Sequence, residues 1–422
     1  MSGQIGNNIL RTSGVIAATA AGLNWVSTVV TASTVTVEAG NGYFINTTSN
    51  TCTITLPSSA EAGDQIVFMD YLRTWGTYKI IIDSNGLNYQ GQDDSYTVEY
   101  DTNGETLNIV YADATQGWIP LDDDVVADEP SPPLTQKAIF AYGNSGSVTN
   151  LSNLVSSSGV VASDVTGVGT ARAAPAAATY GTDKAIFAYG YTSGPSYVSM
   201  SNLVNNSGVV ATDVSGVGTA RSGLDAAEYG TDKAIFAYGY TGSNVATSNL
   251  VNSSGVVASD VSGVGTVRNG AGAAGYGEDK AIFGYGYDGS RLSMTNLVSN
   301  VGVVGSDVGG VGTARSYLAA AKYGTDKAIF GYGYDGSPLS MSNLVSNSGV
   351  VASDVSGVGT ARYDLAGASY GGDKAIFGYG TAASGKVSLT NLVNSSGVIA
   401  ADVTGVGTAR SEIAAAGYSS SA

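Results

Sequence analysis

The sequence contains no histidine, and its 422 residues include a single cysteine. Histidine is the commonest general base and the commonest metal ligand in proteins, so its absence argues against Ser-His-Asp hydrolysis, zinc hydrolysis and copper-oxidase chemistry. Cys52 has no partner for an internal disulfide, so we expect folding in a reducing cytoplasm rather than a disulfide-stapled secreted domain. The sequence assigns no catalytic residue, no metal ligand and no cofactor.

Charged residues are also scarce, at 12% of the chain against about 25% in an average protein. No apolar run reaches the roughly 18 residues that a membrane span needs, so we expect no membrane insertion. The net charge of −16 leaves no basic footprint for nucleic acid or anionic lipid. Hydrophobic residues make up 43% of the chain, which is enough apolar surface for large cores. The composition therefore predicts a soluble globular protein that does not bind nucleic acid.

The acidic residues are unevenly distributed along the chain. Residues 1–133 carry 16 of the 34 acidic side chains but 3 of the 18 basic ones, together with all three tryptophans. This half ends in an acidic, proline-rich stretch at residues 122–133, which is typical of a semi-rigid linker. The sequence thus predicts two differently composed parts joined by this linker.

The second part is organised by an internal repeat. The phrase Lys-Ala-Ile-Phe recurs at spacings of 47, 49, 47, 47 and 47 residues, starting at Lys137, Lys184, Lys233, Lys280, Lys327 and Lys374. In the third repeat, β-rich segments at 224–229, 233–240, 248–251 and 256–261 are separated by glycine-containing turns. Four short strands per repeat without helical periodicity are typical of a β-propeller blade.

The two ends of the repeat region complement each other. The first repeat lacks the strand that precedes Lys-Ala-Ile-Phe in the other five, whereas residues 408–418 form such a strand with nothing after it. Joined, the two ends make one complete blade. The sequence therefore predicts an all-β chain whose residues 134–422 form a six-bladed propeller closed by the C-terminal strand, a closure that leaves no sheet edge exposed.

Each repeat places an arginine after a loop, then a small-residue strand, then an aromatic strand that ends in glycine, as in Thr219-Ala220-Arg221 followed by Phe236 to Tyr240. This order resembles the kelch family over residues 134–418, about two thirds of the chain. The repeat departs from the kelch pattern because it lacks the paired glycines and the outer-strand tryptophan. The resemblance implies a kelch-like propeller, and in that family arginines at this position can bind acidic ligands.

Residues 33–121 are expected to form a separate all-β domain. Hydrophobic alternation is clear at 34–37, 52–56 and 96–100, and Asn85-Gly86 and Asn103-Gly104 are hairpin-type turn signals. Cys52 is in phase with Ile54 and Leu56, which predicts a small buried residue rather than a nucleophile.

The segments at 42–48, 53–57, 62–66 and 110–118 resemble a module common in bacteriophage tail-fibre and other virion proteins. The resemblance implies a fibre-type β-sandwich, a homotrimer and attachment to a particle. By the same analogy, residues 1–32 are expected to be a virion anchor segment that orders against other virion proteins.

The repeat arginines allow two interpretations. They could form an anion-binding ring near one mouth of the central channel. Alternatively, and preferably, each could pair with a repeat aspartate and hold adjacent blades together. The arginines are Arg172, Arg221, Arg268, Arg315, Arg362 and Arg410. The aspartates are Asp164, Asp213, Asp260, Asp307, Asp354 and Asp402. One phenylalanine per repeat, at Phe140, Phe187, Phe236, Phe283, Phe330 and Phe377, is expected in the core between blades.

The loops after the second strand of each repeat differ most between repeats. Because recognition generally lies on loops held by a rigid scaffold, this rim is the candidate ligand-binding face. Its candidate residues are Tyr191, Tyr197, Tyr240, Tyr287, Arg291, Tyr334 and Lys386. Neutral drift in exposed turns is the alternative.

Together these features favour a phage virion structural protein, a tail fibre that displays the propeller for host-surface receptor recognition and adsorption. Its expected partners are a host-surface glycan or protein, and its expected location is the virion. A capsid decoration or head fibre protein and a bacterial surface carbohydrate-binding lectin remain alternatives. An enzyme is disfavoured because a hydrolase needs non-equivalent carboxylates close together, whereas the acids here mostly recur in every repeat.

Overall fold

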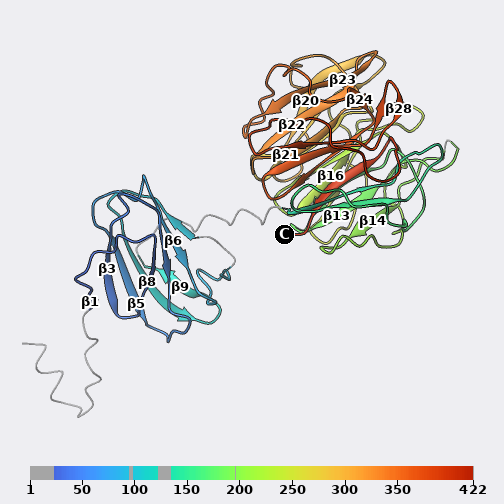
Figure 1. Cartoon of the computed structure of the whole chain (residues 1–422). Coiled ribbons are helices and arrows are strands. Elements are labelled where there is room, and N and C mark those ends of the chain that lie inside the picture. The colour runs from blue at the N-terminus through green and yellow to red at the C-terminus, as the bar shows by residue number, and fades with distance from the viewer. Residues whose placement is uncertain (1–22, 95–97, 122–134, 195, 422) are drawn as a thin grey trace, which may run out of the picture. The chain divides into compact units, whose positions relative to one another are not determined.

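The structure is a computed structural model that describes residues 23–94, 98–121, 135–194 and 196–421. The described residues are all-β (Figure 1), and they contain no helix long and apolar enough to cross a membrane. The chain divides into two compact units between Pro130 and Ser131. The predicted linker at 122–133 and most of the predicted anchor, residues 1–22, lie outside the described residues.

The first unit consists of two sheets. One sheet has the order β1 (Asn24–Trp25), β3 (Asn41–Ile45), β5 (Gln65–Asp70), β8 (Thr106–Asp113) and β9 (Gly117–Pro120). The other has the order β2 (Thr34–Thr36), β4 (Cys52–Thr55), β6 (Ile80–Asp83) and β7 (Val98–Tyr100). From β1 to β6 the chain alternates between the sheets, so neighbouring strands among these six run parallel.

A single hydrophobic core fills this unit. Cys52, Ile54, Trp75 and Trp118 are fully buried in it. The predicted burial of Cys52 is thus confirmed. Burial also raises the pKa of the Cys52 thiol to about 11, so the thiol stays protonated at neutral pH and is not a reactive thiolate.

Two sequence-based expectations for this unit are wrong. The Asn103-Gly104 turn joins no hairpin, because β7 and β8 belong to different sheets. Strands β6 and β7 do pair antiparallel, but residues 84–97 connect them instead of a tight turn at Asn85-Gly86. Asparagine and glycine adopt a positive φ wherever the chain must turn, and here φ is 56° at Asn85 and 80° at Gly104. Such a turn does not require the strands on either side of it to pair with each other.

The start of this unit also lies earlier than residue 33. Asn24 and Trp25 pair in parallel with Asn41 and Gly42, and the Trp25 ring stacks on Phe44 at 4.8 Å between ring centroids. Residues 24–25 therefore belong to the sheet.

Each of the six repeats of the second unit contributes a three-stranded antiparallel sheet. The first sheet consists of β12 (Ala176–Tyr180), β13 (Lys184–Ala188) and β14 (Ser201–Val204), and the second of β15 (Asp225–Tyr229), β16 (Lys233–Ala237) and β17 (Ser248–Val251). The third consists of β18 (Gly272–Tyr276), β19 (Lys280–Tyr287) and β20 (Arg291–Val298), and the fourth of β21 (Ala319–Tyr323), β22 (Lys327–Tyr334) and β23 (Pro338–Val345). The fifth consists of β25 (Ala366–Tyr370), β26 (Lys374–Gly378) and β29 (Thr390–Val393). The sixth combines β30 (Ala414–Tyr418), β10 (Lys137–Ala141) and β11 (Ser152–Val155), and a small extra sheet is formed by β24 (Arg362–Tyr363), β27 (Thr381–Ala382) and β28 (Gly385–Lys386).

The prediction of a fourth strand in each repeat is wrong. The segment after β17 makes two isolated bridges, Val251 with Val257 and Ser248 with Val261, and no continuous ladder. The carboxylate of Asp260 in this segment accepts a hydrogen bond of 2.6 Å from Thr219 Oγ1, in the loop before β15. The segment therefore contacts the chain that enters its own sheet instead of extending that sheet as a regular strand.

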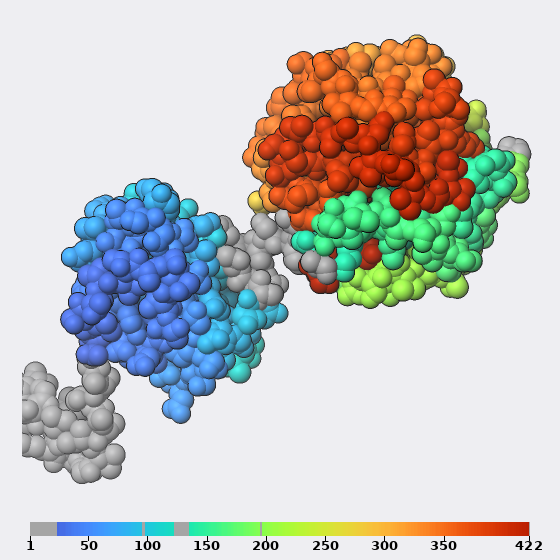
Figure 2. Space-filling view, viewed as in Figure 1, coloured from blue at the N-terminus to red at the C-terminus, as the bar shows by residue number. Residues whose placement is uncertain are grey.

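The predicted pairing of the two ends of the repeat region is confirmed. Strand β30 pairs with β10 over five residues, from Lys137 opposite Tyr418 to Ala141 opposite Ala414. Figure 2 shows the red surface of the last residues lying against the green surface of the early repeats. The first strands of the six sheets contact one another in succession, from β12 through β15, β18, β21 and β25 to β30, and β30 contacts β12.

Backbone hydrogen bonds run in a closed cycle through the residues that precede these first strands. In each repeat, the N–H of the second residue after the repeat arginine donates to the carbonyl of its counterpart in the preceding repeat, at 2.7–3.3 Å, and Ala174 N–H donates to Glu412. All six residues have a φ of 47–59°, and they are Ala174, Gly223, Gly270, Tyr317, Asp364 and Glu412. A second cycle at the other end of the strands includes Gly181 N–H to Asp232 and Ser419 N–H to Asp183.

Aromatic rings fill the spaces between successive sheets. Each repeat phenylalanine is fully buried, which confirms its predicted core position. Each also contacts a tyrosine of the preceding repeat at 5.2–5.5 Å between ring centroids. The pair Phe140 and Tyr379 completes the series across the two ends of the repeat region.

Candidate functional site

The repeat arginines lie between neighbouring sheets. The Arg221 guanidinium is fully buried and sits 4.3 Å above the ring of Tyr189 in the preceding repeat. Its Nη2 donates to Asn249 Oδ1 at 2.8 Å and its Nε to the Tyr238 carbonyl at 2.9 Å. Burial lowers the pKa of Arg221, although Tyr189 partly offsets the effect. Stacking on an aromatic face and fork-like donation to several acceptors are the properties that distinguish arginine from lysine.

The repeat aspartate contacts this cluster mainly through the asparagine. Asp260 accepts from Asn249 Nδ2 at 2.9 Å and from the backbone and side chain of Thr219. Burial on its own would raise the pKa of Asp260, but hydrogen bonds from Thr219 and Asn249 and the charge of Arg221 outweigh it and lower that pKa. The favoured Arg–Asp partnership is therefore largely indirect, with direct ion pairs at 3.7 Å for Arg410–Asp164 and 3.9 Å for Arg315–Asp354.

The alternative interpretation, an open anion-binding ring, does not fit this geometry. All six guanidinium groups have no exposed surface, and they belong to Arg172, Arg221, Arg268, Arg315, Arg362 and Arg410. In five of them Nη2 donates to the repeat asparagine, and in Arg172 it donates to the Phe187 carbonyl. A ligand anion has no path to these groups because the rings of the adjoining repeat cover them.

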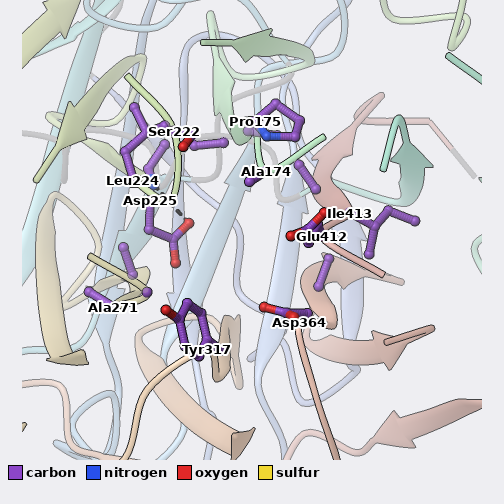
Figure 3. A pocket seen from close by; sticks show the side chains of 18 of the residues that line it. Ala174, Pro175, Ser222, Leu224, Asp225, Ala271, Tyr317, Asp364, Glu412 and Ile413 are labelled. Carbon is purple, nitrogen blue, oxygen red and sulfur yellow. Dashed lines mark hydrogen bonds between the residues drawn. The ribbon is translucent and has the colours of Figure 1, made fainter. Parts of the chain in front are cut away.

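A cavity of about 390 Å³ opens at the end of the repeat unit where the first strands begin. Apolar and polar side chains share its wall, and Leu224, Leu318, Leu365 and Ile413, which directly precede β15, β21, β25 and β30, supply much of the apolar part. Figure 3 shows the carboxyl groups of Asp225, Asp364 and Glu412 and the ring of Tyr317 around the same hollow. A concave pocket of this size with a few convergent polar groups is typical of a small-molecule site.

The cavity is asymmetric because the six residues of the first cycle of backbone hydrogen bonds, those that precede the first strands, differ in size. Three successive repeats place Ala174, Gly223 and Gly270 there, and the next three place Tyr317, Asp364 and Glu412. A Cβ atom on Gly270 would lie 2.7 Å from the Tyr317 ring, so glycine at this position makes room for that ring. One side of the cavity is thus open, and the other carries the large polar side chains.

Two of the three carboxyl groups that line the cavity, those of Asp364 and Glu412, lie on that side, and the third is that of Asp225. Tyr191 Oη donates to Glu412 Oε2 at 2.6 Å, and burial together with this bond raises the pKa of Tyr191 to about 12. Burial, and then the charge of Glu412, raises the pKa of Asp364 to about 7, while the exposed Lys386 lowers it slightly. Burial also raises the pKa of Asp225 to about 7, although its carboxylate accepts the Ala226 N–H at 2.8 Å. The described lining residues include neither lysine nor arginine.

Below the cavity, the space between the first strands narrows. Small residues line this part, including Ala177, Ala226, Ala273, Ala320, Gly367 and Ala415. Beneath them, Lys322 Nζ lies 3.1 Å from Glu228 Oε1. These two side chains come from β21 and β15, which are separated by β18 in the order of contact, so the ion pair crosses the space and limits the depth of the cavity.

Part of the predicted rim lies at this cavity. Tyr191 and Tyr240 line it, and Tyr197 contacts Tyr240 edge-on at 6.1 Å between ring centroids. Of the predicted ligand-binding residues, Tyr191 and Tyr240 are therefore the ones that line the cavity.

The remaining rim residues are arranged outside the lining. The Arg291 guanidinium lies 4.9 Å above the Tyr334 ring, and Tyr334 in turn packs on Tyr363. Lys386 is exposed and donates to Asn144 Oδ1 at 2.6 Å, and the Tyr287 carbonyl accepts from Asn244. None of these four rim residues lines the cavity, although the charge of Lys386 acts on Asp364.

Sequence reasoning missed four cavity residues: Asp225, Tyr317, Asp364 and Glu412. The signal that could have found Tyr317, Asp364 and Glu412 is the second position after each repeat arginine, where the residue type varies among the six repeats. Asp225 lies at the fourth position after Arg221, where the other five repeats have alanine or glycine. Asp225, Asp364 and Glu412 are exceptions to the observation that the acids mostly recur in every repeat, because their counterparts in most other repeats are alanine or glycine.

The described part of the chain contains no group of three or more side chains placed to hold a metal ion. No protein-family model matches the sequence, and no curated protein is detectably similar to it.

Proposed function

We propose that this chain is a structural protein of a bacteriophage virion, a tail fibre whose repeat unit recognises a receptor on the host surface. The observation that carries the proposal is the convergence of variable residues on one cavity. The repeats share their arginine, asparagine and phenylalanine contacts, whereas the residues that differ between them, such as Tyr317, Asp364 and Glu412, line the cavity. A rigid repeated scaffold with variable residues at one end is suited to recognition.

Within this proposal the six repeat sheets are the blades of a six-bladed, kelch-like propeller. The cyclic contacts of the first strands, the β10–β30 pairing and the two cycles of backbone hydrogen bonds support it. The arginine at the lead of each first strand and the small residues that follow it support the kelch-like assignment.

The virion assignment depends on the first unit. Its segments resemble a tail-fibre module, and its two sheets share one core, as in a sandwich. On this basis the chain forms a homotrimer, and its N-terminal segment contacts other virion proteins.

The proposed role is binding without catalysis. The neighbouring acids Asp364 and Glu412 could in principle serve a hydrolase, because one of them has a raised pKa. Release of sugar from host envelopes by the full chain, abolished by Asp364→Asn, would therefore contradict the proposal.

The decisive experiment localises the chain on purified particles. Antibody-gold labelling in the electron microscope should place it on tail fibres, and an excess of the full chain should block adsorption to host cells. Absence of the chain from purified particles would reject the virion assignment. Label on the head instead would favour the capsid decoration or head fibre alternative.

A bacterial surface lectin is the second candidate. It is favoured by Tyr191, Tyr240 and Tyr317 around the cavity, because aromatic rings at a concave site can stack on sugar rings. Recovery of the chain in the cell envelope of uninfected bacteria, and not in particles, would support this candidate over a virion protein.

A further inference from the structure

We propose that the cavity binds the protonated amino group of an amino sugar, with the ammonium held by Asp364 and Glu412 and the sugar ring against Tyr317. The inference rests on the proposed recognition function, because it names the chemistry that the receptor presents to this site.

Charge selects a cation for the cavity. Asp225, Asp364 and Glu412 line it, and no described lining residue carries a positive charge. An anionic ligand would be repelled, whereas an ammonium group would remove the repulsion between the two neighbouring carboxyl groups. A metal ion is not favoured, because the described residues offer no cluster of three or more ligands.

Asp364 is the group that lacks a partner. Glu412 already accepts from Tyr191 Oη, and Asp225 accepts a backbone N–H. No group among the described residues hydrogen-bonds to the Asp364 carboxyl, which points into the cavity in Figure 3. A partly buried carboxyl without a donor is unfavourable, and three ammonium protons would supply donors to both Asp364 and Glu412.

The shape of the site favours a ring over a linear chain. The cavity has a volume of about 390 Å³, which is at the small end of ligand pockets and fits one or two sugar rings. The Tyr317 ring stands beside the carboxyl groups and packs over Gly270, and the small residues Ala174 and Gly223 leave the opposite side clear. A sugar bearing an amino group matches this combination of an aromatic surface, a wide opening and a pair of acids.

The test measures binding of glucosamine to the full chain by titration calorimetry at pH 7. N-acetylglucosamine and glucose are the neutral matches, and Nα-acetyl-lysine amide presents the same ammonium on a linear chain. Asp364→Asn removes the charge at nearly constant shape. Asp335→Asn is the matched control, because Asp335 is exposed in a rim loop outside the cavity.

We expect glucosamine to bind the wild-type chain and the neutral sugars to bind about tenfold more weakly or worse, since they lose the charge-assisted bonds. Asp364→Asn should weaken glucosamine binding by a similar factor, and Asp335→Asn should leave it unchanged. Affinity should rise between pH 5 and pH 7 as Asp364 ionises beside Glu412, Tyr317 and Lys386. If Asp364→Asn fails to fold, two other measurements still test the inference. Tyr317→Ala should weaken glucosamine binding, and the wild-type chain should bind glucosamine more tightly than N-acetylglucosamine.

Three results would overturn the inference: equal binding of the neutral sugars, binding of the lysine amide as tight as that of glucosamine, or no glucosamine binding at millimolar concentration. Any of these leaves the proposed function standing if the full chain still blocks adsorption. Conversely, glucosamine binding by a chain that is absent from particles would reject the virion function and retain the site.

Discussion

Arg410 Nη2 donates a hydrogen bond of 2.6 Å to Asn153 Oδ1, joining residues that lie 257 positions apart. Arg410 Nε also donates to the Tyr142 carbonyl, and Thr408 Oγ1 donates to Asp164. The same contacts form within the other repeat sheets, as in Arg315, which precedes β21, with Asn343 in β23. The two ends of the repeat region thus complete one sheet with the same contacts that form within each of the other repeat sheets.

Removal of residues 411–422 should destroy the cooperative unfolding of the repeat unit. Strand β10 would lose its five-residue pairing with β30, and the sheet edges of β10 and of the neighbouring repeats would be exposed. Calorimetry should then show a broadened or absent transition for residues 134–410. Removal of residues 421–422 is the control, and a melt unchanged by the longer deletion would show that closure contributes nothing.

Arg315→Lys should destabilise the repeat unit by about 2–3 kcal/mol, in spite of the retained charge. Lysine cannot stack on Tyr285 while donating to the Asn343 side chain and the Tyr332 carbonyl, so buried acceptors lose their donor. Lys233→Ala removes an exposed pair with Asp232 and should cost less than about 1 kcal/mol. Urea denaturation of both variants measures the difference, and equal losses would contradict the assigned role of the buried guanidinium.

Asp225→Asn should stabilise the chain more at pH 8 than at pH 5. The folded-state pKa of Asp225 is about 7, against an ordinary value of 3.8, so between these values the folded state binds more protons than the unfolded one. The contribution of Asp225 to the free energy of unfolding therefore falls as pH rises through this window. Asparagine removes that loss and still offers an oxygen to the Ala226 N–H. Melting temperatures at the two pH values test this, and a pH-independent difference between variant and wild type would refute it.

Gly270→Ala should reshape the cavity, whereas Gly223→Ala should not. Both residues have a left-handed φ, 57° and 59°, so both variants lose about 1–2 kcal/mol to backbone strain. The new methyl group would lie 2.7 Å from the Tyr317 ring at position 270, but its nearest neighbour at position 223 would be 3.6 Å away. Glucosamine binding should fall in Gly270→Ala alone, and an equal effect of both variants would argue against Tyr317 as a wall of the site.

Lys322→Met should destabilise the chain by about 1–3 kcal/mol, because Glu228 would keep a charge in the narrow space without its partner. Adding Glu228→Gln to this variant should restore most of the loss, since a neutral pair needs no counter-charge. Chemical denaturation of the single and double variants measures the coupling. Additive losses would show that the two side chains do not interact across the space.

Several features were predictable from the sequence because they depend on periodicity. The repeat spacing located β10, β13, β16, β19, β22 and β26, and the phase of Cys52 with Ile54 predicted its burial. The missing first strand of one repeat and the surplus strand at the end predicted the pairing of β30 with β10. Alternation and repetition along the sequence indicate where strands lie and which of their side chains are buried, even when the strand that packs against them is not known.

The tertiary structure alone decided what the repeated polar residues contact. Arg221 looks like a surface ligand group in a sequence, and its burial follows from the ring of Tyr189 and the side chain of Asn249, which come from two different repeats. In the same way, Asp225, Asp364 and Glu412 are far apart along the chain, and they meet because the first strands lie side by side. The sequence by itself determined the spacing of the repeats and the positions of their strands. The contacts of the buried arginines and the cavity between the first strands depend on distances between residues that are remote in the sequence, and no local pattern encodes those distances.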